Sequence, residues 1–131
     1  MKAVTWQGKQ KMEIRNVDDP RILEPTDAII RITATAICGS DLHLYHHGEA
    51  VLEKGYVVGH EPMGIVEEVG SQVQTLKKGQ RVVIPFNISC GHCHFCLNHM
   101  ESQCDESNPD QLYGGLFGFG KLNGNHWGGQ A

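Results

Sequence analysis

Residues 90–104 read CGHCHFCLNHMESQC, which places Cys90, Cys93, Cys96 and Cys104 in the spacing C-x2-C-x2-C-x7-C. A structural zinc site takes four ligands in a tetrahedron and favours thiolates. Two-residue gaps let a tight turn direct successive sulfurs to one point, and the longer last gap lets the chain close the tetrahedron. Because the segment has no hydrophobic period, we predict a loop lobe over 88–106 that bound zinc stabilises in place of a core.

Disulfides and an iron–sulfur cluster are the alternatives for these cysteines. The chain has five cysteines, an odd number that cannot all pair, and its N-terminus lacks the apolar stretch of a secretory signal. A ferredoxin-type run ends in C-x3-C-P, whereas Leu97 follows Cys96 with no proline nearby. Zinc is therefore favoured. Since four thiolates complete the shell, we interpret the intervening histidines as exposed loop residues: His92, His94 and His99.

The sequence before this lobe predicts short β-strands. The clearest is 27–37, DAIIRITATAI, which alternates polar with apolar residues and is rich in β-branched side chains. The other segments that predict strands are 2–6, 12–17, 64–69 and 81–85. Residues 40–45 predict one helical turn, with Ser40 or Asp41 as its N-cap. The sequence therefore predicts a mostly β, mostly antiparallel domain with one metal-clamped lobe.

Two further segments carry groups suited to chemistry. Residues 38–43, CGSDLH, bring a thiol, a hydroxyl, a carboxylate and an imidazole together just after the predicted strand 27–37. Residues 59–64 read GHEPMG. Taken alone, each is a weak signal, because a single cysteine after a strand is more often a small buried apolar residue, and a single histidine is more often structural.

Together with the lobe, these segments resemble the zinc-dependent alcohol dehydrogenases of the medium-chain dehydrogenase/reductase family. Residues 59–73 read G-H-E-x2-G-x5-G-x2-V, which resembles the zinc signature of that family. The segment 38–43 resembles its first-ligand segment, and the cysteine run has the spacing of its structural-zinc lobe. The tail 113–131 further resembles the formaldehyde dehydrogenase-like and the polyol or threonine dehydrogenase-like branches.

The resemblance implies a fold and two zinc sites. It implies a GroES-like catalytic domain over 1–131, which is a partly open antiparallel β-barrel with short helices and a zinc-clamped loop lobe. Cys38 and His60 would be the first two protein ligands of a catalytic zinc, and Glu61 would ligate it transiently in exchange with water. The four cysteines of the lobe would hold the structural zinc.

The resemblance also implies catalytic roles and partners. Asp41 would accept a hydrogen bond from the ring of His60, Ser40 would contact the alcohol oxygen, and His43 would pass the proton to solvent. Zinc would act as a Lewis acid, and hydride would pass between a small alcohol or aldehyde and NAD(P). The full-length form would be a homo-oligomer.

The sequence departs from the family pattern in two ways. Members of the family are more than twice as long and carry a third catalytic-zinc ligand, Cys or Asp, well beyond the lobe; Asp105 and Asp110 lie too close to it. The nearest approach to a dinucleotide-binding G-x-G-x-x-G is 118–123, GFGKLN, which ends in asparagine and follows no predicted strand. We therefore expect a domain incomplete at its C-terminus, without a Rossmann domain: a fragment of a longer enzyme that is inactive alone.

The charge and hydrophobicity of the chain argue against some classes of binding partner. The net charge is -4 and basic residues form no long run, which argues against nucleic acid or an anionic membrane as partner. No apolar stretch reaches the roughly 18 residues of a membrane span, so we expect a cytoplasmic protein. Two other functions stay open: a zinc-binding module without catalysis, and a chaperonin-like interaction role suggested only by the GroES-like fold.

Overall fold

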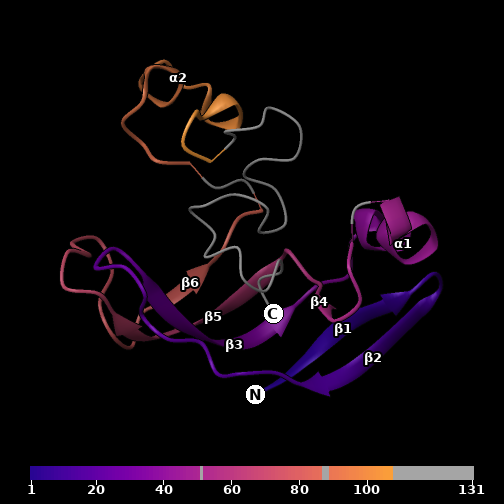
Figure 1. The fold of residues 1–131 in the computed structure, drawn as a ribbon. Coiled ribbons are helices and arrows are strands. Elements are labelled where there is room, and N and C mark those ends of the chain that lie inside the picture. Colours follow the sequence, from indigo (N-terminus) through magenta and orange to yellow (C-terminus); the bar gives the residue numbers. More distant parts are fainter. Residues whose placement is uncertain (51, 87–88, 108–131) are drawn as a thin grey trace.

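Two three-stranded antiparallel sheets form the body of the computed structural model, which describes residues 1–50, 52–86 and 89–107 (Figure 1). The first sheet has the order β2-β1-β4, and the second has the order β3-β5-β6. The strands are β1 (Lys2–Gly8), β2 (Lys11–Asn16), β3 (Ala28–Thr35), β4 (Tyr56–Val57), β5 (Pro62–Val69) and β6 (Arg81–Val83). The helices are α1 (Gly39–His47), η1 (Gly48–Ala50), α2 (His94–Leu97) and η2 (Glu101–Gln103).

The mostly antiparallel β prediction is confirmed, with shifts at the ends of the elements. Each of the five predicted strands is present, whereas the two-residue β4 was not predicted. The helix is longer than expected and begins one residue earlier. Its N-cap is Cys38, not Ser40 or Asp41, because Asp41 is the third helical residue and its Oδ2 accepts a hydrogen bond from the Cys38 amide at 2.8 Å.

The chain crosses between the sheets at two places that matter for the site. Cys38 lies just after β3, on the crossing that runs through α1 and η1 to β4. His60 lies on the short crossing from β4 to β5. The far end of α1 is fixed to the β1–β2 turn, where the Gln10 amide donates to the Tyr45 carbonyl at 2.8 Å. The first crossing is thereby held against the first sheet.

The buried core is small. In the first sheet it includes Ala3, Trp6 and Val57, and Val66 of β5 is 1% exposed. Trp6 packs directly on Gly48, where an added Cβ would lie 3.0 Å from the Trp6 Nε1 atom. Close packing around the glycine therefore locates the end of α1 over the first sheet.

Two glycines of the 59–73 motif are required by close backbone approach. A Cβ on Gly64 would lie 2.4 Å from the Arg31 carbonyl oxygen of the paired strand β3. A Cβ on Gly70 would lie 2.3 Å from the Pro25 carbonyl oxygen. These contacts involve main-chain atoms that cannot rotate away, so both positions admit only glycine without a backbone shift.

We expect Gly70→Ala to destabilise the chain by about 3 kcal/mol, because the new methyl group overlaps the Pro25 carbonyl. That carbonyl is fixed in place, since it accepts a hydrogen bond from the Gln72 amide at 2.8 Å. Urea unfolding of the zinc-loaded chain measures the change. The matched control is Gly39→Ala, where an added Cβ meets nothing within 4 Å. Equal unfolding midpoints for the two variants would contradict the steric argument.

Candidate metal centres

The first candidate centre is formed by Cys38, His60 and Glu61. Their ligand atoms all lie within 4.8 Å of one another. Cys38 comes from the N-cap of α1, and the other two come from the crossing that precedes β5. One thiol, one imidazole and one carboxylate converging in this way are a donor set that suits zinc.

The ring of His60 is oriented by Asp41. His60 is 3% exposed, and its Nδ1 lies 3.1 Å from Asp41 Oδ1. An ionised carboxylate only accepts hydrogen bonds, so we assign the proton of the neutral ring to Nδ1. Nε2 is then left with its lone pair, and it lies 3.2 Å from Ser40 Oγ. Asp41 thus fixes both the N-cap amide and the ring tautomer.

The Cys38 thiol is prepared for metal binding. Hydrogen bonds from the Ser40 hydroxyl and then from the Ser40 amide hold the pKa of the Cys38 thiol below its usual range. The thiolate is the form that ligates a metal. Ser40 has one hydroxyl proton for two neighbouring acceptors, Cys38 Sγ and His60 Nε2, so it can donate to only one of them at a time.

We expect Asp41→Asn to weaken zinc binding at this centre by about 10- to 100-fold. Asp41 accepts hydrogen bonds on both oxygens. Asparagine has only one side-chain oxygen, so the variant must lose the hydrogen bond from either the Cys38 amide or the His60 ring. Competition with a zinc indicator dye measures the affinity. The matched control is Asp27→Asn, because Asp27 accepts from the Leu23 and Glu24 amides in a loop away from the cluster. An unchanged affinity in Asp41→Asn would show that the carboxylate does not orient the ligand.

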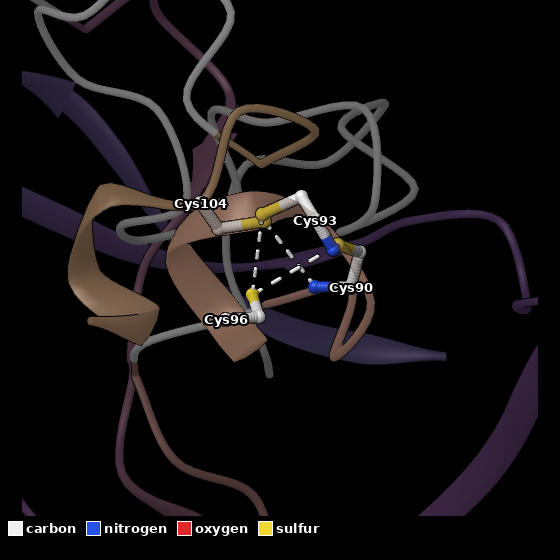
Figure 2. Close-up of side chains that lie close together, drawn as sticks. All are labelled: Cys90, Cys93, Cys96 and Cys104. Atoms are coloured by element: carbon white, nitrogen blue, oxygen red, sulfur yellow. Dashed lines mark hydrogen bonds between the residues drawn. The ribbon is translucent and has the colours of Figure 1, made fainter. Parts of the chain in front are cut away.

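The second candidate centre is formed by the four cysteines of the lobe, drawn in Figure 2. All the sulfurs lie within 4.8 Å of one another, and the structure contains them as free thiols. Cys93 Sγ is 3.5 Å from Cys96 Sγ, and Cys90 Sγ is 3.9 Å from Cys96 Sγ. A tetrahedron with Zn–S bonds of about 2.3 Å places its sulfurs about 3.8 Å apart. The spacing fits a zinc ion and is much too long for disulfide bonds.

Burial and hydrogen bonding shift the pKa values of these thiols in different directions. Burial raises the pKa of the Cys96 thiol to about 12. Burial also acts against ionisation of Cys104, but hydrogen bonds from Ser107 and from the Cys90 amide outweigh it and lower its pKa to about 6. The backbone amides of Cys96 and Asp105 lower the pKa of Cys93. The surroundings of Cys93 and Cys104 therefore favour the thiolate that zinc requires, whereas burial of Cys96 opposes it.

The remaining predicted residues lie around these centres. His43 is exposed on α1, three residues after Ser40, so it lies on the same side of the helix. The three lobe histidines are exposed, as interpreted from the sequence: His92, His94 and His99. Asp105 is exposed in the turn after Cys104. Asp110, the segment 118–123 and the tail 113–131 lie outside the described residues.

One neighbour of the first centre was missed. The Phe86 ring meets the His60 ring edge-on, with centroids 6.2 Å apart, and is 44% exposed. It follows β6 and precedes the lobe, and no local pattern in the sequence connects it with His60 twenty-six residues earlier. Only the antiparallel pairing of β5 with β6 brings the two together.

Comparisons with known proteins agree with this geometry. The family described as alcohol dehydrogenase GroES-like domain matches residues 24–131. An uncharacterized zinc-type alcohol dehydrogenase-like protein of Bacillus subtilis is 56% identical over 131 residues, which cover 100% of this chain and 35% of the relative. A glutathione-independent formaldehyde dehydrogenase of Pseudomonas aeruginosa is 37% identical, covering 99% of this chain and 33% of that protein.

The structural comparison gives the same result. The alcohol dehydrogenase TADH from Thermus sp. ATN1 superposes with a TM-score of 0.82 at 42% identity, over 100% of this chain and 36% of that chain. The predicted fold class is confirmed by this likeness. The chain thus spans about a third of the length of the relatives that it matches. Within the described ranges, no helix has the length and apolarity needed to cross a membrane.

Proposed function

The chain belongs to the alcohol dehydrogenase GroES-like domain family, and on that premise we propose that it is the zinc-binding catalytic part of an alcohol dehydrogenase. The proposed enzyme oxidises a small alcohol, or reduces an aldehyde or ketone, with NAD or NADP. One observation carries the proposal: Cys38, His60 and Glu61 converge in a cluster separate from the four-cysteine lobe. A module stabilised by the lobe alone has no use for this first cluster.

We assign a zinc ion to each centre. Cys38 and His60, with Glu61, would hold the catalytic zinc, and Cys90, Cys93, Cys96 and Cys104 would hold the structural one. When bound at the first centre, zinc supplies a Lewis acid that favours loss of the alcohol proton near neutral pH. The four cysteines that converge in the lobe fill a tetrahedral shell, which suits a closed structural site.

The side chains around the first centre would orient the substrate and move its proton. The Ser40 hydroxyl lies beside both Cys38 and His60, where it can accept the proton of the alcohol. His43, on the same side of α1 and exposed, would carry that proton to solvent. The Phe86 ring, which is partly exposed, would provide an apolar surface against the carbon chain of the substrate.

The domain and its partners follow from the same proposal. We propose that 1–131 is a GroES-like domain with its structural-zinc lobe at 88–106. A nicotinamide, when bound, would supply the hydride chemistry, and the described residues would supply the metal ligands. The proposed enzyme is a cytoplasmic homo-oligomer acting on a small molecule.

A chimera tests the proposed function. Residues 1–131 would replace the matching third of the Bacillus subtilis relative, which supplies the rest of an enzyme chain. We expect the chimera to bind about two zinc ions per chain and to reduce NAD or NADP with short-chain alcohols. The parent relative, assayed with the same alcohols, is the control. A folded chimera with two zinc ions, next to an active parent, that oxidises none of these alcohols would refute the proposal.

A further inference from the structure

The charge of the lobe poses a problem that its metal ligands do not solve. Four thiolates and one zinc ion leave about two negative charges in the lobe. Cys104 is 0% exposed and Cys96 is 6% exposed, so part of this charge is buried, and buried charge needs compensation. Between Arg81 and Lys121 the sequence contains no lysine or arginine, while Glu101, Asp105 and Glu106 add negative charge.

Backbone amides supply much of the compensation. The Cys90 amide lies 3.3 Å from Cys104 Sγ. The amides of His92 and Cys93 lie 3.5 and 3.3 Å from Cys90 Sγ. Such N–H groups stabilise negative sulfur without carrying a charge of their own. Their positions are set by the turns of the lobe, so single substitutions leave them largely in place.

Ser107 adds a donor that the backbone cannot supply. It lies in the turn 105–107 that follows Cys104, and it is 2% exposed. Both its hydroxyl and its amide donate hydrogen bonds to Cys104 Sγ. Apart from the cysteines themselves, it is the one side chain within the described residues 89–107 with a hydrogen bond to a cluster sulfur.

Cys104 is also the ligand that depends most on such support. The other three cysteines are separated by two residues each, whereas seven residues separate Cys104 from Cys96. The chain between them passes through Met100 and the short η2 helix, and His99 has a positive φ of 59°. The position of the fourth sulfur is thus fixed less by local turns than the positions of the first three.

We propose that Ser107 is a positioning residue that keeps the Cys104 thiolate on the structural zinc. This inference rests on the proposed zinc site of the lobe. The hydroxyl withdraws electron density from a buried sulfur that has no cationic side chain nearby in the sequence. It thereby slows both dissociation of that ligand and its attack by electrophiles.

The experiment compares zinc release from variants made in a Cys38→Ser background, where only the lobe retains zinc. Ser107→Ala should release zinc to excess chelator about 10-fold faster than the background chain. Ser107→Thr, which keeps the hydroxyl, should stay near the background rate. Ser102→Ala removes an exposed serine of η2 and should change nothing. In the cobalt-substituted chain, Ser107→Ala should shift the sulfur-to-metal charge-transfer band to longer wavelength, because the sulfur becomes more electron-rich.

The outcomes distinguish the role of Ser107 from the existence of the structural zinc site. Equal release rates for Ser107→Ala and Ser102→Ala would overturn the role of Ser107. So would a Ser107→Thr variant that releases zinc as fast as Ser107→Ala, since volume and not the hydroxyl would then be responsible. If Ser107→Ala loses its zinc during purification, Ser107→Thr decides between the same two explanations. A background chain that holds no zinc at all would instead refute the structural zinc site.

Discussion

Replacing Cys104 with serine should remove one zinc ion from each chain and unfold the lobe that it closes. Structural zinc in small domains contributes about 10–16 kcal/mol of binding free energy at neutral pH, and little else holds this segment together. The described residues 89–107 have only α2 and η2 as regular structure, and the buried residues among them are Cys96, Cys104 and Ser107. Without the fourth thiolate, the remaining three leave an open and weaker site.

Zinc analysis and limited proteolysis together measure this effect. We expect the zinc content to fall by about one ion per chain, and new cleavage to appear in the lobe while the sheets stay protected. The control is Cys38→Ser, which should also lose one zinc but leave the lobe resistant to the protease. A Cys104→Ser chain that keeps its lobe zinc and its protection would show that the lobe does not depend on the metal.

In the chimera with the Bacillus subtilis relative, Cys38→Ser should lower kcat/KM for alcohol oxidation by about 10³-fold or more. Loss of Lewis-acid stabilisation raises the activation free energy by several kcal/mol, and each 1.36 kcal/mol lowers the rate by a factor of about ten. Serine keeps the shape of the N-cap residue but offers a neutral hydroxyl in place of a thiolate. The Asp41 carboxylate still accepts from the residue 38 amide, so α1 should keep its start.

The metal content distinguishes a lost ligand from a lost fold. Cys38→Ser should retain the structural zinc and lose the other, and added zinc should not restore turnover. The control for a change near the site is Leu42→Ala, which alters an exposed side chain of the same helix. Near-normal activity in Cys38→Ser would place the catalytic metal elsewhere.

The features that were predictable from the sequence are those fixed by local spacing. The cysteine run determines which sulfurs can meet, because two-residue gaps restrict the turn between ligands, and the sulfurs do converge. Strand β3 was readable from its alternation of polar and apolar residues. Local spacing could not place Asp41 beside His60, because the two are nineteen positions apart. That contact was predicted only from the family resemblance.

The features that escaped prediction depend on contacts distant in the sequence. Strand β4 is two residues long and exists because Thr5 and Trp6 pair with it. Phe86 reaches His60 through the pairing of β5 with β6. Ser107 was not singled out, because a serine three residues after a cysteine has no distinctive pattern until the turn brings it onto the sulfur. Gly64 and Gly70 were visible as motif letters, but the steric reason for each needed the structure: the paired strand β3 for Gly64 and the turn at Pro25 for Gly70.

The position of the first metal centre on the two sheet crossings has a mechanical consequence. A metal ion bound by both Cys38 and His60 would close a loop of the chain that contains α1, η1 and β4. It would thereby link edge strand β4 of the first sheet to the second sheet. Cross-links of this kind reduce the entropy of the unfolded chain, much as a disulfide does. The catalytic ion would therefore also cross-link the two chain segments that connect the sheets. Removal of the metal would loosen the connection between the two sheets before it loosened either sheet.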